Sequence, residues 1–348
     1  MMKSAREILD SYDGKPLRIM EVCGTHTHEI FRLGIRRILP DNVRLISGPG
    51  CPVCVTPCGY IDEAVFLALE KNAVICTFGD LVRVPGSEMS LAGARASGAE
   101  IRTVYSPLDA LAYAESAPDR EVVFLSVGFE TTTPGSCLAV RKAIAGGVKN
   151  FSVLSANKTM PRAYEVLKGS ADAFLYPGHV SVMTGTKLYE RLCAEGVSGI
   201  VTGFTADEIL TALAAIVTLS KRGEPFFRNC YPRVVRAEGN PAALKLMDEV
   251  MEPCDAEWRG LGVIPGSGMK LRAGFSGHDA RIKFGLSEIR GRDNPACSCG
   301  RILRGECAPP DCPLFGKVCT PSHPAGACMV SGEGACSAFY QYGEKNNG

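Results

Sequence analysis

The stretch that decides the fold is IMEVCGTHTH at residues 19–28, followed by GPGCPVC at residues 48–54. The apolar residues 19–22 predict a short strand that ends at Cys23, with a helix beginning near His26. A second apolar run, residues 43–47, ends at the glycine-rich loop that carries Cys51 and Cys54. Because successive parallel strands end at one edge of a sheet, we expect these thiols and the imidazole to face one crevice.

Strand and helix patterns alternate along the chain from residue 19 onward. Strands are predicted at residues 19–22, 43–47, 73–78, 101–105, 122–127, 152–155, 173–176 and 199–202. Helices are predicted at residues 28–39, 61–71, 108–116, 135–145, 162–168, 187–194, 207–220 and 240–251. The strands are continuous apolar runs, as expected when helices cover both faces of a parallel sheet. The predicted fold class is therefore α/β, with two lobes of parallel sheet flanked by helices.

Changes in this pattern suggest five regions. They are an N-terminal segment at 1–18 that packs on the C-terminal domain, lobe 1 at 19–118, lobe 2 at 119–225, a segment returning to lobe 1 at 226–290, and a small cysteine-rich C-terminal segment at 291–348. Beyond residue 290 the periodicity vanishes, and Gly, Pro and Cys dominate. Such a segment cannot bury a core of its own, so we expect a metal centre to hold it.

Composition narrows the class of protein. The chain has 348 residues, is 46% hydrophobic and carries a formal net charge of +1, so it has no general attraction to nucleic acid or to a membrane surface. No apolar run reaches the roughly 18 residues of a membrane span, and the charged start lacks a signal peptide's apolar core. We therefore expect a cytoplasmic protein. Its 16 cysteines then indicate metal binding or redox chemistry instead of structural disulfides.

Seven of the cysteines follow residue 296. Four of them make a widely spaced set, with three more in reserve: Cys297, Cys312, Cys319 and Cys336, then Cys299, Cys307 and Cys328. Four thiolates can hold zinc or an iron–sulfur cluster. The paired knuckles typical of structural zinc are absent, so the spacing favours the cluster and leaves zinc as the alternative.

The N-terminal thiols allow two interpretations. Cys51 and Cys54 form a Cys-x-x-Cys pair, which can be a thiol–disulfide couple or half of a zinc site completed by Cys58 and by Cys23 or His26. At a helix start the backbone dipole favours a thiolate at Cys23. A thiolate beside an imidazole suits iron, nickel or zinc.

Three further loops follow predicted strands. The hydroxyl-rich turn at residues 128–135 opens a helix and can cradle an anion, but it lacks the lysine of a nucleotide-binding P-loop. The loops at residues 157–161 and 177–181 are more typical of structural turns. Together they can line the cleft.

Four motifs, in order along the chain, carry a resemblance to a known family. They lie at residues 21–26 (EVCGTH), 48–54 (GPGCPVC), 128–134 (GFETTTP) and 328–336 (CMVSGEGAC). The chain resembles the HypD family of hydrogenase maturation proteins over essentially its whole length. The resemblance implies two α/β lobes and a C-terminal iron–sulfur segment holding a 4Fe-4S cluster.

The resemblance also implies partners and site residues. It implies work with a HypC-type small chaperone and a HypE-type cyanide donor, on iron that gains two cyanides and one carbon monoxide for a nickel–iron hydrogenase. By position, Cys23 resembles the cysteine that helps to hold this iron, with His26 beside it, and Cys51 and Cys54 resemble the redox-active pair. The resemblance assigns the cluster to Cys297, Cys312, Cys319 and Cys336.

Three classes of function follow from these observations. The first is a redox-active scaffold for assembly of the Fe(CN)2CO group, with electrons from a 4Fe-4S cluster reaching the iron through the Cys-x-x-Cys pair. The second is a cluster-linked thiol–disulfide oxidoreductase acting on protein disulfides. The third is a zinc-stabilised binding protein.

Overall fold

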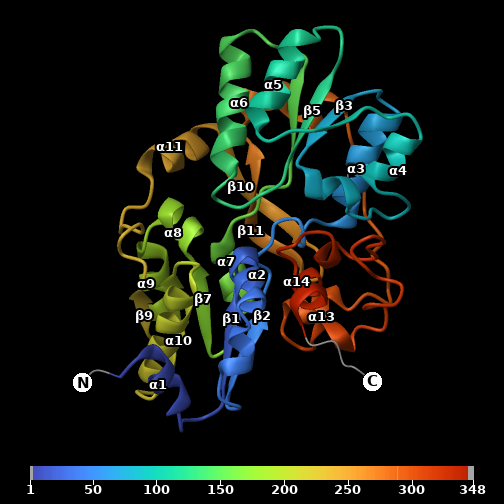
Figure 1. The fold of residues 1–348 in the computed structure, drawn as a ribbon. Helices are drawn as coiled ribbons and strands as arrows, with labels where there is room; N and C mark the ends of the chain where they lie inside the picture. Colours follow the sequence, from blue (N-terminus) through green and yellow to red (C-terminus); the bar gives the residue numbers. More distant parts are fainter. Residues whose placement is uncertain (1–2, 288, 344–348) are drawn as a thin grey trace.

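The computed structural model describes residues 3–287 and 289–343, and it contains two parallel sheets, one above the other in Figure 1. Sheet A has the strand order β2-β1-β7-β8-β9, and sheet B has the order β4-β3-β5-β6. The strands of sheet A are β1 Leu17–Glu21, β2 Val43–Ser47, β7 Ala173–Pro177, β8 Gly199–Thr202 and β9 Phe227–Asn229. Those of sheet B are β3 Val74–Thr77, β4 Ile101–Thr103, β5 Val122–Ser126 and β6 Phe151–Ser155. The predicted α/β class is confirmed.

The two sheets do not divide the chain at residue 119, where the sequence suggested the boundary between lobes. Sheet A combines β1 and β2 with β7, β8 and β9, while sheet B takes all the strands between β3 and β6. Met20 of β1 pairs with Ile46 of β2 on one side and with Phe174 of β7 on the other. The chain therefore crosses to sheet B after β2 and returns after β6. Strand pairing over this sequence distance leaves no trace in local periodicity.

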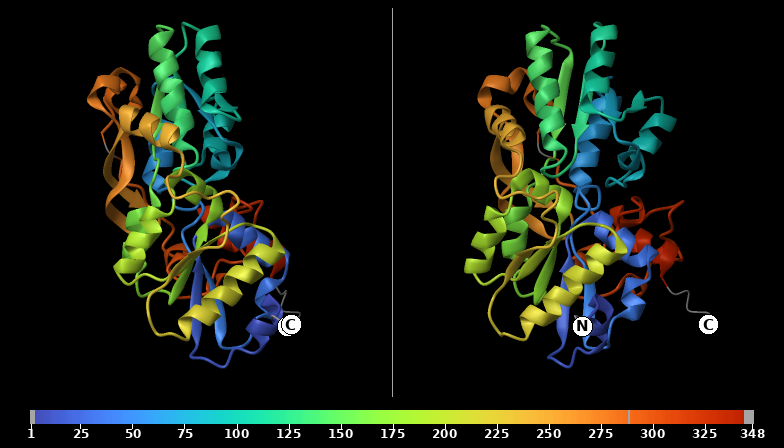
Figure 2. Two further views of the ribbon diagram at one scale, coloured as in Figure 1. Left: turned by 90° about the vertical axis from the view of Figure 1, so that its left-hand side faces the viewer. Right: turned by 60° about the vertical axis from the view of Figure 1, so that its left-hand side comes forward.

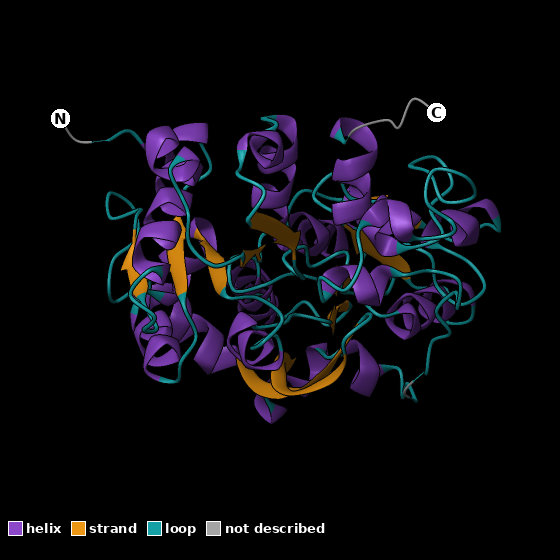
Figure 3. Ribbon diagram, turned by 90° about the horizontal axis from the view of Figure 1, so that it is seen from below, coloured by secondary structure: helices purple, strands orange, loops and turns teal. Residues whose placement is uncertain are grey.

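Helices cover both faces of each sheet, as the view from below in Figure 3 shows. One face of sheet A buries its side chains against α1, α2 and α10, and the opposite face packs on α7 and α9. In sheet B, α3 and α4 cover one face, and α5, α6 and α11 cover the other. The bounds of these helices are α1 Ala5–Asp10, α2 Gly24–Arg32, α3 Cys58–Leu69, α4 Leu91–Ala96, α5 Pro107–Ser116, α6 Thr133–Ala145, α7 Met160–Val166, α9 Lys187–Ala194, α10 Ala206–Ser220 and α11 Pro241–Val250.

The N-terminal segment packs differently from the prediction, and the predicted return segment packs on elements of both predicted lobes. Helix α1 packs on α10 rather than on the C-terminal segment, and Lys221 forms an ion pair with Asp13 there. In the predicted return segment, β9 extends sheet A by pairing with β8. The rest, comprising α11, the hairpin β10 Met251–Trp258 and β11 Gly262–Leu271, and α12 Ala280–Lys283, packs beside sheet B (Figure 2). The tip of the hairpin points down toward the C-terminal segment (Figure 1).

The C-terminal segment has little regular structure, as its composition predicts. It contains the short helices α13 Cys299–Leu303 and α14 Ala335–Tyr342. Its apolar side chains join the core on one face of sheet A, where Ile302 and Met329 are buried, and α14 packs on α2. The segment is thus anchored by a core that it shares with sheet A. In the described part of the chain, no helix has both the length and the apolar character needed to cross a membrane.

Candidate functional site

The candidate site lies at the carboxyl edge of sheet A, where the chain order of the strands reverses. Strand β1 is followed by β2 on one side, and β7 pairs with β1 on the other side. In open α/β sheets such a reversal opens a crevice at the carboxyl ends of the two diverging strands. Cys23 follows β1, and His179 follows β7 at the start of α8 Gly178–Thr184. The topology alone therefore brings these two residues together.

Cys23 is the N-cap residue of α2, and its side chain is 1% exposed. Its Sγ lies 3.7 Å from Nε2 of His179. Burial raises the pKa of the Cys23 thiol to about 12, although hydrogen bonds from the backbone of His26 and Thr25 act to lower it. The sequence-based expectation of a favoured thiolate is therefore wrong for the metal-free protein, because desolvation outweighs the helix terminus.

His26 and His179 both contact the same aromatic ring. The ring of Phe204 is 4.7 Å from the His26 ring and 5.1 Å from the His179 ring, measured between centroids. Nε2 of His26 is 2.8 Å from the carbonyl oxygen of Gly203, so this nitrogen carries the proton and donates. Nδ1 of His26 is buried and has no hydrogen-bond partner within residues 3–287 and 289–343. It is consequently the nitrogen of His26 that is free to bind a metal.

The loop after β2 brings Cys51 and Cys54 to the same edge. The backbone N–H of Gly24 donates to the carbonyl oxygen of Gly50, with a separation of 3.0 Å. A Cβ at Gly50 would stand 2.0 Å from the backbone nitrogen of Cys23, so only glycine permits this contact. The structure therefore brings the Cys-x-x-Cys loop against the Cys23 turn.

Cys51 and Cys54 are both buried free thiols. The backbone N–H of Cys54 donates to Sγ of Cys51 at 3.3 Å. Hydrogen bonding to Cys328 and to Cys51, together with burial, raises the pKa of the Cys54 thiol well above its usual value. The pair is thus in contact with a thiol of the C-terminal segment, about 270 residues away along the chain.

Six cysteines of the C-terminal segment line one small cavity. They are the four predicted ligands Cys297, Cys312, Cys319 and Cys336, together with Cys299 and Cys328. Backbone N–H groups donate to two of these sulfurs, from Ser298 to Cys312 at 3.5 Å and from Ala325 to Cys319 at 3.3 Å. Such bonds stabilise thiolates. The metal-binding side chains of this lining are all thiols, beside the apolar Ile302, Phe315 and Met329, and such a donor set fits a soft metal centre.

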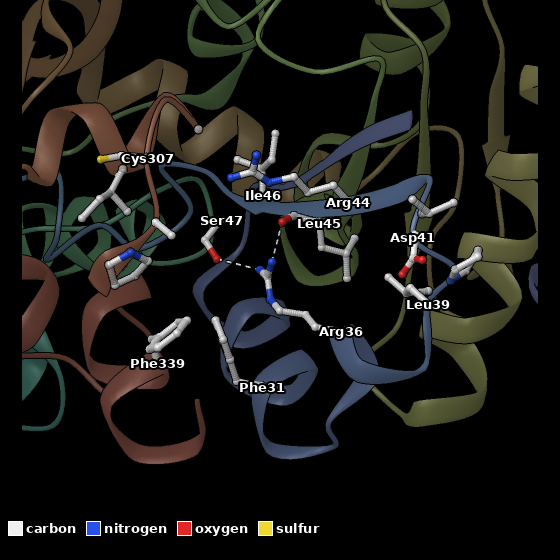
Figure 4. A pocket seen from close by; sticks show the side chains of 16 residues that line it. Phe31, Arg36, Leu39, Asp41, Arg44, Leu45, Ile46, Ser47, Cys307 and Phe339 are labelled. Carbon is white, nitrogen blue, oxygen red and sulfur yellow. Dashed lines mark hydrogen bonds between the residues drawn. The ribbon is translucent and has the colours of Figure 1, made fainter. Parts of the chain in front are cut away.

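The three reserve thiols have different surroundings. Sγ of Cys299 and Sγ of Cys328 lie 2.9 Å apart inside the cavity. Hydrogen bonds from Cys299 and Cys54 lower the pKa of Cys328 well below its usual value. Cys307 instead lines a separate pocket of about 350 Å³ beside the edge strand β2, where Figure 4 also shows Arg36 bonded to Ser47 and Leu45. Cys307 is therefore outside the cysteine-lined cavity.

Cys58 begins α3 and contacts a buried arginine. Arg259, at the hairpin tip, is 4% exposed and donates from Nη2 to Sγ of Cys58 at 2.7 Å. Its Nε is 2.7 Å from Asp293, and its backbone N–H donates to the carbonyl oxygen of Val55, just after the Cys-x-x-Cys pair. Cys58 is thus held by Arg259 and Asp293, away from Cys23. This arrangement gives no support to a zinc site made by Cys51, Cys54, Cys58 and Cys23.

Across residues 3–287 and 289–343, no three His, Cys, Asp or Glu side chains are grouped so that they can hold one metal ion. The Cys23 edge accordingly supplies only part of a coordination shell.

Two contacts of this edge are not predicted by the sequence. His179 lies in a loop that the sequence marks only as a structural turn, and its chain distance from Cys23 hides the contact. Oε1 of Glu333, from the C-terminal segment, accepts a hydrogen bond of 2.7 Å from Oγ1 of Thr25. A Cβ at Gly24 would meet the Glu333 carboxylate at 2.8 Å, which explains the glycine there.

The hydroxyl-rich turn at residues 128–135, which the sequence offered as an anion cradle, makes contacts within its own backbone. Thr133 donates its hydroxyl to the carbonyl oxygen of Phe129.

Comparisons with known proteins cover almost all of the chain. Residues 1–343 match the family described as "HypD: Hydrogenase formation hypA family". The chain is 47% identical over 343 residues to hydrogenase maturation factor HypD of Cupriavidus necator, covering 95% of this chain and 90% of that protein. It is 43% identical over 341 residues to hydrogenase maturation factor HypD of Escherichia coli strain K12, covering 96% and 91%. It is also 43% identical over 354 residues to HypD of Azotobacter vinelandii, covering 98% and 93%.

Proposed function

Because the chain belongs to the HypD family of hydrogenase maturation factors, we propose that it is the redox-active scaffold on which an iron ion becomes the Fe(CN)2CO group of a nickel–iron hydrogenase. The observation that carries the proposal is a series of thiol contacts that connects the carboxyl edge of sheet A to the cysteine-lined cavity. Cys51 contacts Cys54 at the edge, Cys54 contacts Cys328, and Cys328 contacts Cys299 inside the cavity.

In this proposal the iron is cargo, held at the carboxyl edge of sheet A. Cys23 supplies a thiolate once its proton is displaced by the metal, and His179 is placed to accept that proton, 3.7 Å away. Nδ1 of His26 is the second candidate donor. A thiolate increases electron density on iron and strengthens its bonds to cyanide and carbon monoxide. Because the chain supplies too few donors for a closed site, the remaining ligands come from cyanide, carbon monoxide and a partner of the HypC type.

We assign a 4Fe-4S cluster to the cavity, with Cys297, Cys312, Cys319 and Cys336 as its ligands. A lining whose metal-binding side chains are all thiols fits a cluster, and the absence of a three-donor single-ion site among the described residues argues against zinc. When bound, such a cluster supplies electrons one at a time. Cys299 and Cys328 are then the two cavity thiols left without a metal-binding role.

The remaining thiols provide a route for disulfide exchange. Sγ of Cys328, the sulfur with the lowered pKa, attacks Sγ of Cys54 in an oxidised Cys51–Cys54 pair. The bond to Cys51 breaks, and Cys51 leaves as a thiolate that takes up a proton. Cys299 then attacks Cys328 and releases Cys54. The products are a Cys299–Cys328 disulfide and a reduced Cys51–Cys54 pair, and the exchange consumes no net electrons.

Burial bears on the oxidoreductase alternative. Cys51 is 4% exposed and Cys54 is 1% exposed, so neither sulfur is open to the disulfide of a folded protein substrate. Electrons reaching this pair are better placed for a reaction inside the crevice, beside Cys23. The burial therefore favours the scaffold over the oxidoreductase.

The test is an infrared spectrum of the anaerobically purified protein, co-expressed with its HypC-type and HypE-type partners. We expect cyanide and carbonyl stretching bands. Cys23→Ser should lose the bands and fail in hydrogenase maturation, because a protonated hydroxyl binds iron poorly. It should keep the fold and the C-terminal cluster.

The matched control is Cys76→Ser, which changes a sulfur inside sheet B. This variant should keep the infrared bands and lose only stability. If Cys23→Ser protein retains both bands, the iron is held elsewhere and the proposal fails.

A further inference from the structure

A separate cavity of about 400 Å³ lies at the carboxyl edge of sheet B. The loop after β6 forms one wall with Asn157 and Lys158, and the β10–β11 hairpin forms the opposite wall with residues such as Met269. Its volume is in the range of pockets that hold small molecules. None of the thiols or imidazoles at the Cys23 edge lines it.

Lys158 stands in this cavity without a counter-ion. Its side chain is 3% exposed, and among the described residues its Nζ forms neither a hydrogen bond nor an ion pair. The centroid of the Trp258 ring is 5.8 Å from Nζ. Burial lowers the pKa of Lys158 to about 8, while the charge of Glu257 acts to raise it. The side chain is therefore still mostly cationic at neutral pH, and an unpaired buried cation is costly.

The other cations around the cavity already have partners. Arg281 is paired with Glu63 and donates to the carbonyl oxygen of Ser155. Lys270 forms an ion pair with Glu252 at 3.3 Å. Of the acidic side chains on the hairpin, Oδ1 of Asp255 accepts a hydrogen bond from the backbone N–H of Gly266, and Glu257 is exposed and makes no ion pair with Lys158. Lys158 is thus the cation available to a ligand.

A second donor next to Lys158 also lacks a partner. Oδ1 of Asn157 accepts a hydrogen bond of 2.5 Å from the hydroxyl of Ser126, while the hydroxyl of Ser155 donates to the carbonyl oxygen of Met269 at 2.7 Å. Nδ2 is buried and has no hydrogen-bond partner among the described residues. A buried donor in a native protein normally has a partner. Two unpaired donors on consecutive residues of one cavity lining, one of them charged, call for an acceptor that carries negative charge.

We propose that this cavity binds a small organic anion whose carboxylate or phosphate group contacts Nζ of Lys158 and Nδ2 of Asn157. Both donors follow β6, in agreement with the general position of ligands at the carboxyl ends of parallel strands. Apolar side chains, including Met269 and Leu286, also line the cavity and suit the uncharged part of such a ligand. This inference is independent of the iron and of the cluster.

The chain contains its own probe for this site. Trp258 is the only tryptophan in the sequence, and its ring is next to Lys158. Binding of an anion at Nζ should change the emission of Trp258 in a saturable way. The probes are phenyl phosphate, benzoate and inorganic phosphate, each titrated into the full chain at constant ionic strength, with sodium chloride as the ionic control. Phenyl phosphate and benzoate distinguish a phosphate ligand from a carboxylate ligand.

Two variants make the test specific. Lys158→Met removes the charge at similar volume and should abolish the saturable response. Because it also removes an unpaired buried cation, it should melt at or above the wild-type temperature in low-salt buffer without added anion. Lys270→Met, at the rim of the same cavity, should keep the response. The proposal is supported if phenyl phosphate or benzoate produces a saturable change in Trp258 emission in the wild-type protein and no such change in Lys158→Met.

Three results would overturn it. The first is the absence of a saturable response to every probe. The second is a response that Lys158→Met retains. The third is equally tight binding of inorganic phosphate and phenyl phosphate, which would rule out any contribution of the apolar lining.

Discussion

Buried cysteines occur both in the core around sheet B and at the carboxyl edge of sheet A, but their neighbours differ. Cys76 on β3 and Cys137 on α6 pack among apolar side chains. Cys23 instead meets an imidazole, and Cys54 meets two other thiols. Burial raises the pKa of Cys23, Cys76 and Cys137 alike, to about 12. Burial alone therefore does not identify a functional cysteine, whereas its polar partners do.

The two sheets otherwise follow the same plan. Each is parallel, and in each the strand order reverses once, between β1 and β7 in sheet A and between β3 and β5 in sheet B. At the edge of sheet B, Ser126 bonds to Ser136 and Asn157 in a network of uncharged groups. Strand topology thus provides the place for a site, and the side chains after each strand decide its chemistry.

The largest expected effect is that of Cys312→Ala in the cysteine-lined cavity. Removing one of four cluster ligands should abolish the cluster's iron and sulfide content, because the remaining thiolates cannot complete its coordination. Residues 291–343 should also become more sensitive to protease, since metal binding contributes folding free energy. Iron and sulfide analysis with limited proteolysis gives the measurement.

Cys307→Ala is the control for that experiment, because Cys307 lies in the same segment but outside the cavity. It should retain full iron and sulfide content. A Cys312→Ala protein with unchanged iron and sulfide would show that the ligand set is different, with Cys299 or Cys328 replacing Cys312.

A smaller effect is expected for Cys54→Ser. After mild oxidation and alkylation, mass mapping of the wild-type protein should find Cys51 joined to Cys54. The variant should lack this disulfide and keep its cluster, because Cys54 does not line the cavity. Cys137→Ser, on α6 beside sheet B, should keep the disulfide and lose about 1–3 kcal/mol of stability from a buried hydroxyl without a partner. Cys51 and Cys54 found free under all oxidising conditions would remove the redox role.

The smallest effect concerns pH and His26. Burial lowers the pKa of the His26 imidazole from its ordinary 6.5 to about 4. Between these values the unfolded chain binds a proton that the folded protein does not, so the stabilising contribution is complete above pH 6.5 and is lost as the pH falls to 4. The lost contribution corresponds to about 3 kcal/mol.

His26→Gln provides the comparison for this effect, because its amide can still donate to Gly203. The difference in unfolding free energy between the metal-free wild-type protein and this variant should increase with pH from 4 to 6.5. Burial raises the pKa of Glu130 to about 7, so its contribution to the unfolding free energy decreases as the pH rises. This contribution is the same in both proteins and cancels in the difference. A difference that does not change with pH would mean that His26 is protonated in the folded protein.

Much of the fold was predictable from local sequence. Continuous apolar runs predicted strands β1 to β8, because residues buried on both faces of a parallel sheet need no polar alternation. Short helices such as α4 and α8, and the hairpin β10–β11, were not predicted. Their sequences are rich in glycine or mix polar and apolar residues without a clear period, and packing against sheets A and B decides their structure.

The candidate site divides in the same way. Sequence by itself determined which chemistry is available: thiols after β1 and β2, imidazole after Cys23, and a cysteine-rich segment too poor in apolar residues to fold independently. Those conclusions follow from residue type, strand ends and spacing. Only the tertiary structure decided which groups meet, because His179, Cys328 and Arg259 reach their partners through strand order and a hairpin tip. Such contacts span more than 150 residues, as between Cys23 and His179, and no local pattern records them.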